Sequence, residues 1–313
     1  MLRMLRVARV SHVPAPGKVP FSVVETLVPL AFVLLWSTGF VGSKLGFPYA
    51  EPFTFLSLRF LLTLLLLLAV VVFTRPAWPR SWRQAGHIAL SGVFLHAVYL
   101  SGTWYAIYLG LPAGLAALIV GLQPVLTAAL APLLGERVSV RAWTGLGLGF
   151  VGVALVVLDK LLVGHHQAVQ PMALLAAGVA LIGTTVGTLH QKRFSSTMPL
   201  VSGTIIQYTV TLLLVGPAAL LFETRQVDWT PEFLFALGWL ILALSLGAMF
   251  LLLYLLRSRT TARVTSLFYL VPPATALEAY LLFNETLGLA ALFGMLVVVL
   301  GVWLVATDAR KAA

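Results

Sequence analysis

The stretch QPVLTAALAPLLGERVSVRAWTGLGLGFVG at residues 123–152 returns in related form as PPATALEAYLLFNETLGLAALFGMLVVVLG at residues 272–301. One offset of 149 residues, without a gap, aligns identical residues along both stretches. The informative matches in so apolar a chain are Pro124 with Pro273, Glu136 with Glu285, Gly145 with Gly294 and Gly152 with Gly301, preceded by Tyr105 with Tyr254. The sequence therefore predicts that the chain consists of two related halves.

Composition places both halves in a membrane. Of the 313 residues, 60% are hydrophobic and 10% are charged, and the mean hydropathy is +1.01. Such a chain cannot assemble a water-soluble surface. Residues 61–72 and 151–158 contain no charge and none of the alternation typical of barrel strands. Helices remain, because in lipid each segment must satisfy its own backbone hydrogen bonds.

Ten segments are long enough to span a bilayer, which takes about 20 mostly apolar residues. We expect helices at residues 27–46, 54–74, 85–109, 112–134, 141–158, 172–191, 200–222, 234–256, 263–283 and 286–307. The remaining polar pieces are short, which leaves no room for a soluble domain.

The net charge of +10 is distributed as in a membrane protein and does not indicate a nucleic-acid partner. Sixteen of the 20 basic residues lie at alternate helix ends; the others are Lys44, Arg59, Lys160 and Arg225. This positive-inside bias predicts that both termini are cytoplasmic, in a multi-pass protein of the cell (inner) membrane. The basic N-terminus lacks the apolar core of a secretory signal, and we favour a topology anchor over organelle targeting.

The repeat divides the ten helices into residues 27–158 and 172–307, flanked by cytoplasmic tails at 1–26 and 308–313. Because five is an odd number, the second half enters the membrane from the opposite side. The first helices of the halves match at an offset of 148, with Gly39 on Gly187 and Lys44 on Lys192. The predicted fold is an all-α integral membrane protein of ten transmembrane helices in two inverted five-helix repeats. Repeats of this kind are typical of transporters with a site between the halves.

The order of short motifs resembles EamA-type members of the drug/metabolite transporter superfamily. The motifs of the first half are WSTGFVGSK at 36–44, Arg59-Phe60, Tyr105 with Ala113, Gln123-Pro124 and Gly135-Glu136-Arg137. The second half follows with Tyr254, Thr265-Ser266, Pro272-Pro273 and Asn284-Glu285. The resemblance covers nearly the whole chain beyond the tail. It implies a ten-helix exporter or carrier of small metabolites, often amino acids or drug-like compounds.

Charged residues near the helix ends are candidates for gating or coupling. By the repeat, Lys44 and Glu285 share the outer side, while Lys192 and Glu136 share the inner side, as two alternating gates would. The alternative is that both glutamates favour the N-terminal ends of the following helices. Arg59 joins this group, with snorkelling of its side chain to the headgroups as the alternative.

Glu278 has no counterpart, because the matching position is Ala129. It lies about 8 Å inside the expected outer boundary at 1.5 Å per residue. Three roles stay open for its carboxyl group: proton coupling, an ion pair with Arg59 or Lys44, and exposure at the interface.

The central cavity is expected between helices 1, 3 and 4 and their mates 6, 8 and 9. The candidate substrate-binding residues are aromatic or polar: Trp36, Phe40, His96, Tyr99, Gln123, Tyr254 and Tyr269. For His96, a satisfied core histidine is the alternative. For Trp36 and the tyrosines, the alternative is anchoring at the membrane interface.

An intramembrane enzyme is the competing function from another class. The chain lacks His-Glu-x-x-His, Gly-x-Ser-x-Gly and phosphate-loop motifs, and aspartate occurs only at 159, 228 and 308. It has no cysteine, which excludes disulfides and thiolate metal sites. We therefore predict no catalytic role, no cofactor and no metal. The expected partners are a small-molecule substrate and the lipid bilayer, with homodimerisation left open. A channel, or a carrier of sugar-linked or lipid-linked substrates, stays an alternative.

Overall fold

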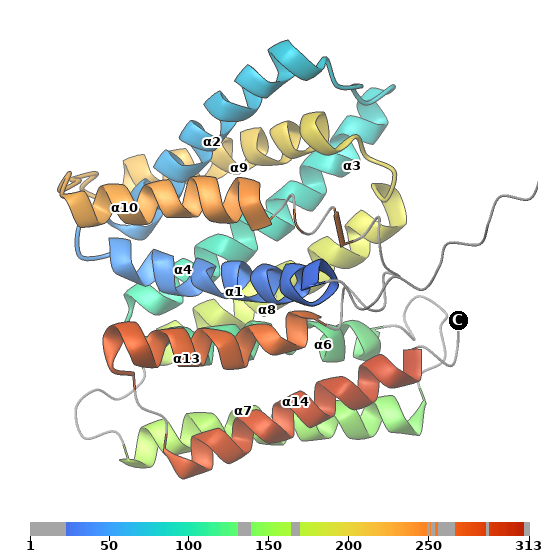
Figure 1. Ribbon diagram of the computed structural model, residues 1–313, viewed down its shortest axis with the longest axis vertical. Coiled ribbons are helices and arrows are strands. Elements are labelled where there is room, and N and C mark those ends of the chain that lie inside the picture. Colours follow the sequence, from blue (N-terminus) through green and yellow to red (C-terminus); the bar gives the residue numbers. More distant parts are fainter. Residues whose placement is uncertain are drawn as a thin grey trace, which may run out of the picture.

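A computed structural model describes residues 23–130, 139–163, 170–248, 251, 254–255, 267–285 and 288–309. These residues form helices joined by short connections (Figure 1), and the only strand-like pairing among them is an isolated bridge between Ala50 and Val227. Glu136, Thr265 and Ser266 lie outside the described residues. The all-helical prediction is confirmed.

The first half contains two long helices, a third with an internal change of winding, a broken fourth and a long fifth. They are α1 (Val23–Gly46), α2 (Pro52–Thr74), α3 (Trp82–Gly92) continuing through the π-helix η1 (Val93–Val98) into α4 (Tyr99–Tyr108), α5 (Ala113–Val120), α6 (Gln123–Leu130) and α7 (Val140–Val163). The second half follows as α8 (Pro171–Phe194), α9 (Leu200–Phe222), α10 (Pro231–Trp239) continuing into the π-helix η3 (Leu240–Ala248), the 3₁₀ turn η4 (Phe268–Leu270), α13 (Val271–Phe283) and α14 (Leu289–Ala309).

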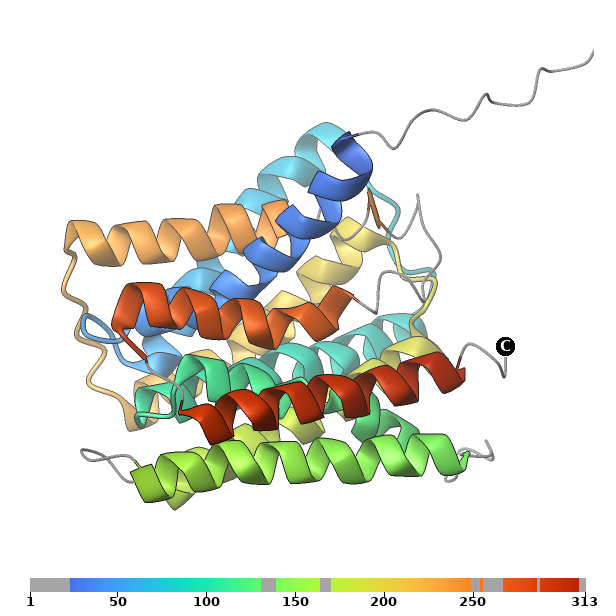
Figure 2. The same ribbon diagram turned by 60° about the horizontal axis from the view of Figure 1, so that its bottom comes forward.

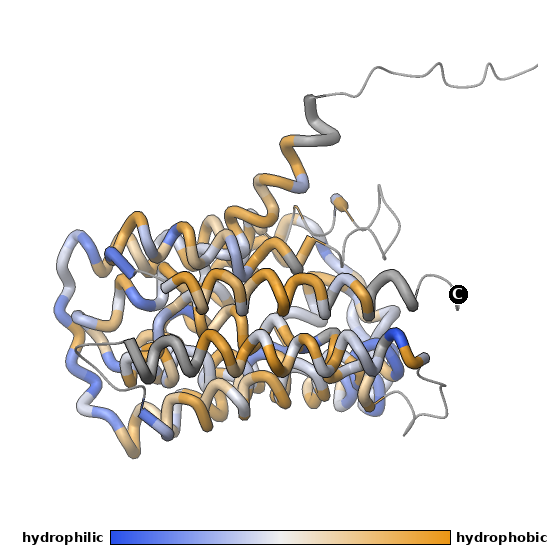
Figure 3. The backbone as a smooth tube through the Cα atoms, turned by 90° about the horizontal axis from the view of Figure 1, so that it is seen from below, coloured by the Kyte–Doolittle hydropathy of each residue, from blue (hydrophilic) through white to orange (hydrophobic). Residues whose placement is uncertain are grey.

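Six helices within the described ranges are long and apolar enough to cross a membrane. They cover Leu27–Gly46, Pro52–Thr74, Trp82–Tyr108, Pro171–Phe194, Leu200–Phe222 and Pro231–Ala248. Hydrophobic segments run along the helices, and hydrophilic ones gather toward the two ends of the bundle (Figure 3). The chain is thus built as a multi-pass membrane protein.

The expected helix at 112–134 is not continuous. It stops at Val120, turns at Gly121 and Leu122, and resumes at Gln123 immediately before Pro124. Proline cannot donate a backbone hydrogen bond, and its ring clashes with the preceding turn. In the second half, the 3₁₀ turn η4 likewise precedes Pro272 and Pro273.

The two π-helices lie at corresponding positions of the halves. Adding the offset of 149 to 93–98 gives 242–247, which falls inside η3. π-Helical turns are rare and often mark functional sites, because they reorient side chains within a helix.

α1 begins and α14 ends at the same end of the bundle (Figures 1 and 2). At the opposite end, the connections at 47–51 and 223–230 brace each other. The Glu223 carboxylate accepts hydrogen bonds from the backbone N–H groups of Phe53 and Thr54 at 2.8 and 2.6 Å, and the Glu51 carboxylate accepts from the Thr224 N–H at 2.6 Å. These contacts fix the start of α2.

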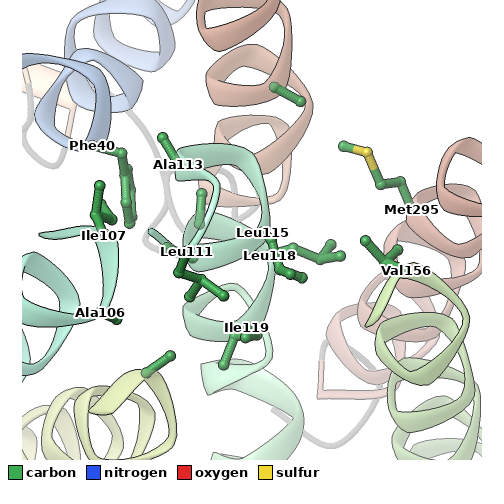
Figure 4. Close-up of a cluster of buried hydrophobic side chains, with 14 of the residues drawn as sticks. Phe40, Ala106, Ile107, Leu111, Ala113, Leu115, Leu118, Ile119, Val156 and Met295 are labelled. Atoms are coloured by element: carbon green, nitrogen blue, oxygen red, sulfur yellow. The ribbon is translucent and has the colours of Figure 1, made fainter. Parts of the chain in front are cut away.

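α7 and α14 pack face to face in opposite directions along a stripe of glycines. A Cβ added at Gly294 would lie 2.6 Å from the Gly152 carbonyl oxygen, and one added at Gly301 would lie 2.6 Å from the Gly145 carbonyl oxygen. Only residues without a side chain permit this approach. A buried apolar cluster then joins α7 and α14 to α1, α4 and α5 (Figure 4), and it includes Phe40, Ile107, Leu118, Val156 and Met295.

Candidate functional site

Arg59 lies at the centre of a buried polar cluster. The arginine, on α2, is only 5% exposed. Its Nε and Nη2 atoms donate to the Ser245 hydroxyl oxygen of η3 over 3.4 and 3.2 Å, and its guanidinium lies 5.7 Å from the centre of the Trp104 ring. Ser245 in turn donates to the carbonyl of Leu240, 3.0 Å away in the same π-helix. The π-winding therefore positions Ser245 for Arg59.

The cluster continues toward η1 through Tyr208 and Gln207 of α9. Tyr208 interacts with both Arg59 and Ser245, and its ring centre lies 5.0 Å from that of His96. His96 Nε2 is 3.4 Å from the Gln207 amide oxygen. We call Arg59, Ser245, Tyr208, His96 and Gln207 the buried polar cluster.

Two contacts in the cluster are counterparts in the repeat. Arg59 and Gln207 are 148 positions apart, the offset that also relates Gly39 to Gly187, and His96 and Ser245 are 149 apart. Each half thus contributes a polar side chain from its second helix to a π-helix of the other half. One side chain is charged and the other is neutral.

Glu278 of α13 contacts Ser37 of α1. The Ser37 hydroxyl oxygen lies 2.6 Å from Glu278 Oε1 and 2.8 Å from the Leu34 carbonyl oxygen. One serine proton cannot serve both acceptors at once, so a protonated Glu278 would supply the missing donor. Glu278 Oε2 has no hydrogen-bond partner within the described part of the chain. Neither Arg59 nor Lys44 pairs with this carboxyl group.

Lys44 instead forms an ion pair with Glu285 at the end of the bundle that holds the 47–51 connection. Glu285 also accepts a hydrogen bond from the Ala113 N–H at 3.2 Å, which ties α1, the start of α5 and the segment after α13 together. The corresponding pair expected on the inner side, Lys192 with Glu136, cannot be described, because Glu136 lies outside the described residues. Lys192 is exposed.

The predicted substrate-binding residues fall into separate groups. His96 and Tyr99 lie at the buried polar cluster, where Tyr99 interacts electrostatically with Arg59. Gln123 donates to the Thr188 hydroxyl at 2.8 Å. Trp36 packs edge-on against Phe268, with ring centres 5.0 Å apart.

Phe40 and Tyr254 lie in other surroundings. Phe40 is buried in the apolar core (Figure 4), and Tyr254 is half exposed. The side chain of Tyr269 is outside the described part. Their substrate-binding role stays a prediction.

Ser245, Gln207 and Ser37 were not expected from the sequence. The repeat offsets point to the first two, because they place Ser245 opposite His96 and Gln207 opposite Arg59. Nothing in the sequence singles out Ser37 as the partner of Glu278.

A cavity of about 310 Å³ lies elsewhere, lined by residues that include Glu51, Phe53, Tyr105 and Glu223. Both of its carboxylates are occupied by backbone N–H groups at the end of the bundle. The buried polar cluster is the better candidate.

A family model described as the EamA-like transporter family matches residues 25–158 and 170–307. A Bacillus subtilis (strain 168) protein named uncharacterized transporter YvbV is 31% identical over 92% of this chain and 94% of its own. A protein of Escherichia coli (strain K12) named probable amino-acid metabolite efflux pump is 27% identical over 90% and 94% of the two chains. A solved crystal structure with 21% identity matches 92% of this chain and 98% of its own, with a TM-score of 0.62.

Proposed function

The chain belongs to the EamA-like transporter family, and on that premise we propose that it is a secondary transporter that exports small metabolites from the cell. Amino acids and drug-like compounds are the substrates we favour. The relative named as an amino-acid metabolite efflux pump supports the first of these classes. A carrier of sugar-linked or lipid-linked substrates is the alternative, because the fold alone does not fix the ligand.

We further propose ten transmembrane helices in two inverted halves that exchange conformations, in a bacterial inner membrane with both tails cytoplasmic. The observation that carries this is duplicated packing. A Cβ added at Gly39 of α1 would lie 3.0 Å from Leu244 of η3, and one added at Gly187 of α8 would lie 2.7 Å from Leu95 of η1. The two contacts are related by the repeat offsets, as are the Arg59–Ser245 and Gln207–His96 contacts. Halves that pack alike can each adopt the conformation of the other.

In this mechanism the Lys44–Glu285 ion pair closes the outer side. When the halves exchange conformations, the pair opens, and the corresponding pair of Lys192 and Glu136 closes the inner side. Each state thus exposes the central site to one side of the membrane.

Glu278 is the candidate for proton coupling. It lies on α13 against Ser37 of α1, two helices whose relative position must change if the halves alternate. Protonation adds a donor that Ser37 can accept, whereas the carboxylate competes with Leu34 for the serine proton. The protonation state therefore changes the contact between the two helices.

Counterflow in proteoliposomes tests the transporter assignment. Vesicles loaded with pooled amino acids and diluted into labelled tracer should accumulate the tracer transiently without ATP, because a carrier exchanges substrate. A channel would only equilibrate the label, and inert protein would leave it outside.

A further inference from the structure

Arg59 is a buried cation that pairs with no anion in the described part of the chain. Its side chain is 5% exposed, and Nη1 has no hydrogen-bond partner among the residues that the structure describes. An unpaired charge inside a membrane protein is costly, and such residues commonly mark the path of a substrate or ion.

Four carboxylates within the described ranges are engaged with other groups. Glu51 and Glu223 accept backbone hydrogen bonds at the end of the bundle. Glu278 contacts Ser37, and Glu285 pairs with Lys44. None of these groups neutralises Arg59.

The contacts that Arg59 does make leave part of its guanidinium available. Ser245 takes Nε and one hydrogen of Nη2, and the Trp104 ring offers a cation–π contact. Nη1 and the second hydrogen of Nη2 remain, side by side on the end of the planar group. This pair of donors matches the two oxygens of a carboxylate.

The repeat shows that the charge is not needed for packing. At the corresponding position in the second half, neutral Gln207 makes the equivalent contact with a π-helix through His96 and also donates to Gln191 at 3.2 Å. A neutral amide thus suffices to hold the second helix of one half to the third helix of the other. The positive charge of Arg59 therefore needs an explanation other than this contact.

We propose that Arg59 binds the carboxylate of the transported substrate, through Nη1 and Nη2. The assignment rests on the proposed transport function and narrows its substrate class to carboxylate-bearing metabolites. The Trp104 ring lies 5.7 Å from the guanidinium, and Tyr99 and Tyr208 are near enough to interact with it; in this proposal these three rings contact the apolar part of the substrate. Ser245 is a positioning residue, because it orients the guanidinium.

The test compares two ligand pools on purified protein. One contains the common amino acids and the other contains the same compounds as α-carboxamides. Thermal stabilisation reports binding, because a ligand of the native state raises the melting temperature. The variants are Arg59→Gln, Arg59→Lys and, as a matched control, Arg225→Gln, which removes the charge of an exposed arginine.

The wild type and Arg225→Gln should bind the acid pool at least tenfold more tightly than the amide pool, because the amide leaves the guanidinium unpaired. Arg59→Gln should lose this preference. If Arg59→Gln fails to fold, Arg59→Lys provides the test. Lysine keeps the positive charge but lacks the pair of parallel donors of the guanidinium, so this variant should bind the acid pool at least tenfold more weakly than the wild type.

Any of the following results would overturn the proposal: equal binding of both pools by the wild type, no binding of either pool, or full acid preference in Arg59→Lys. Equal stabilisation by matched sodium chloride would also overturn it, since the site would then hold any anion. Counterflow with both pools separates the two claims. Equal counterflow of both pools would support the transporter function and refute the carboxylate site. Arg59-dependent binding without counterflow would support the site and refute the transporter function.

Discussion

Replacing Gly152 by alanine tests the contact between α7 and α14. The new methyl carbon would lie 2.5 Å from the Gly294 carbonyl oxygen and 2.8 Å from the Val298 backbone nitrogen. Ordinary contacts begin near 3.4 Å, so the helices must separate by up to about 1 Å. Backbone atoms cannot rotate away as a side chain does, and overpacking of this kind costs about 1–3 kcal/mol. We expect the melting temperature in detergent to fall.

Gly147→Ala is the matched control on the same helix. A Cβ at Gly147 meets nothing within 4 Å, so this variant gains only the better helix propensity of alanine, up to about 1 kcal/mol. Since both variants share that gain, the difference between them reports the contact with α14. Equal melting temperatures for Gly152→Ala and Gly147→Ala would refute the packing of these two helices.

Two further predictions concern topology and coupling. The chain has no cysteine, so Ala77→Cys and Gln226→Cys each introduce a single thiol. A reagent that cannot cross the membrane should label Gln226→Cys in intact cells and Ala77→Cys only after the cells are opened. Labelling of both variants from one side contradicts the topology. Glu278→Gln should abolish proton-driven accumulation while largely preserving substrate exchange, because the amide mimics the protonated carboxyl group. Equal damage to both fluxes with a large loss of melting temperature would instead show a structural role.

The sequence predicted the helical membrane character because it follows from local pattern. Long apolar runs dictate helices in lipid. The repeat singled out Gly152 and Gly294 as matched glycines without predicting that they meet, and the structure brings them together. Residue type shows where a close helix contact is allowed, but the pairing of the two helices follows from how they pack.

The partners of the buried polar residues could not be predicted in the same way. Sequence gives the depth of Glu278 along its helix but not the direction of its side chain, so Arg59 and Lys44 both remained open. In the structure, Lys44 has Glu285 nearby, and Glu278 faces Ser37. The π-helices that orient Ser245 and His96 also escaped prediction, because one extra residue per turn hardly changes an apolar pattern.

Alternating access is tested most directly by locking the outer ion pair. Lys44→Cys and Glu285→Cys, combined in a chain without other cysteines, can be joined by a short bifunctional methanethiosulfonate reagent. Cross-linking should stop counterflow in proteoliposomes, and a reductant should restore it, while neither single variant responds. Undiminished counterflow after complete cross-linking would contradict a mechanism in which the Lys44–Glu285 contact must open.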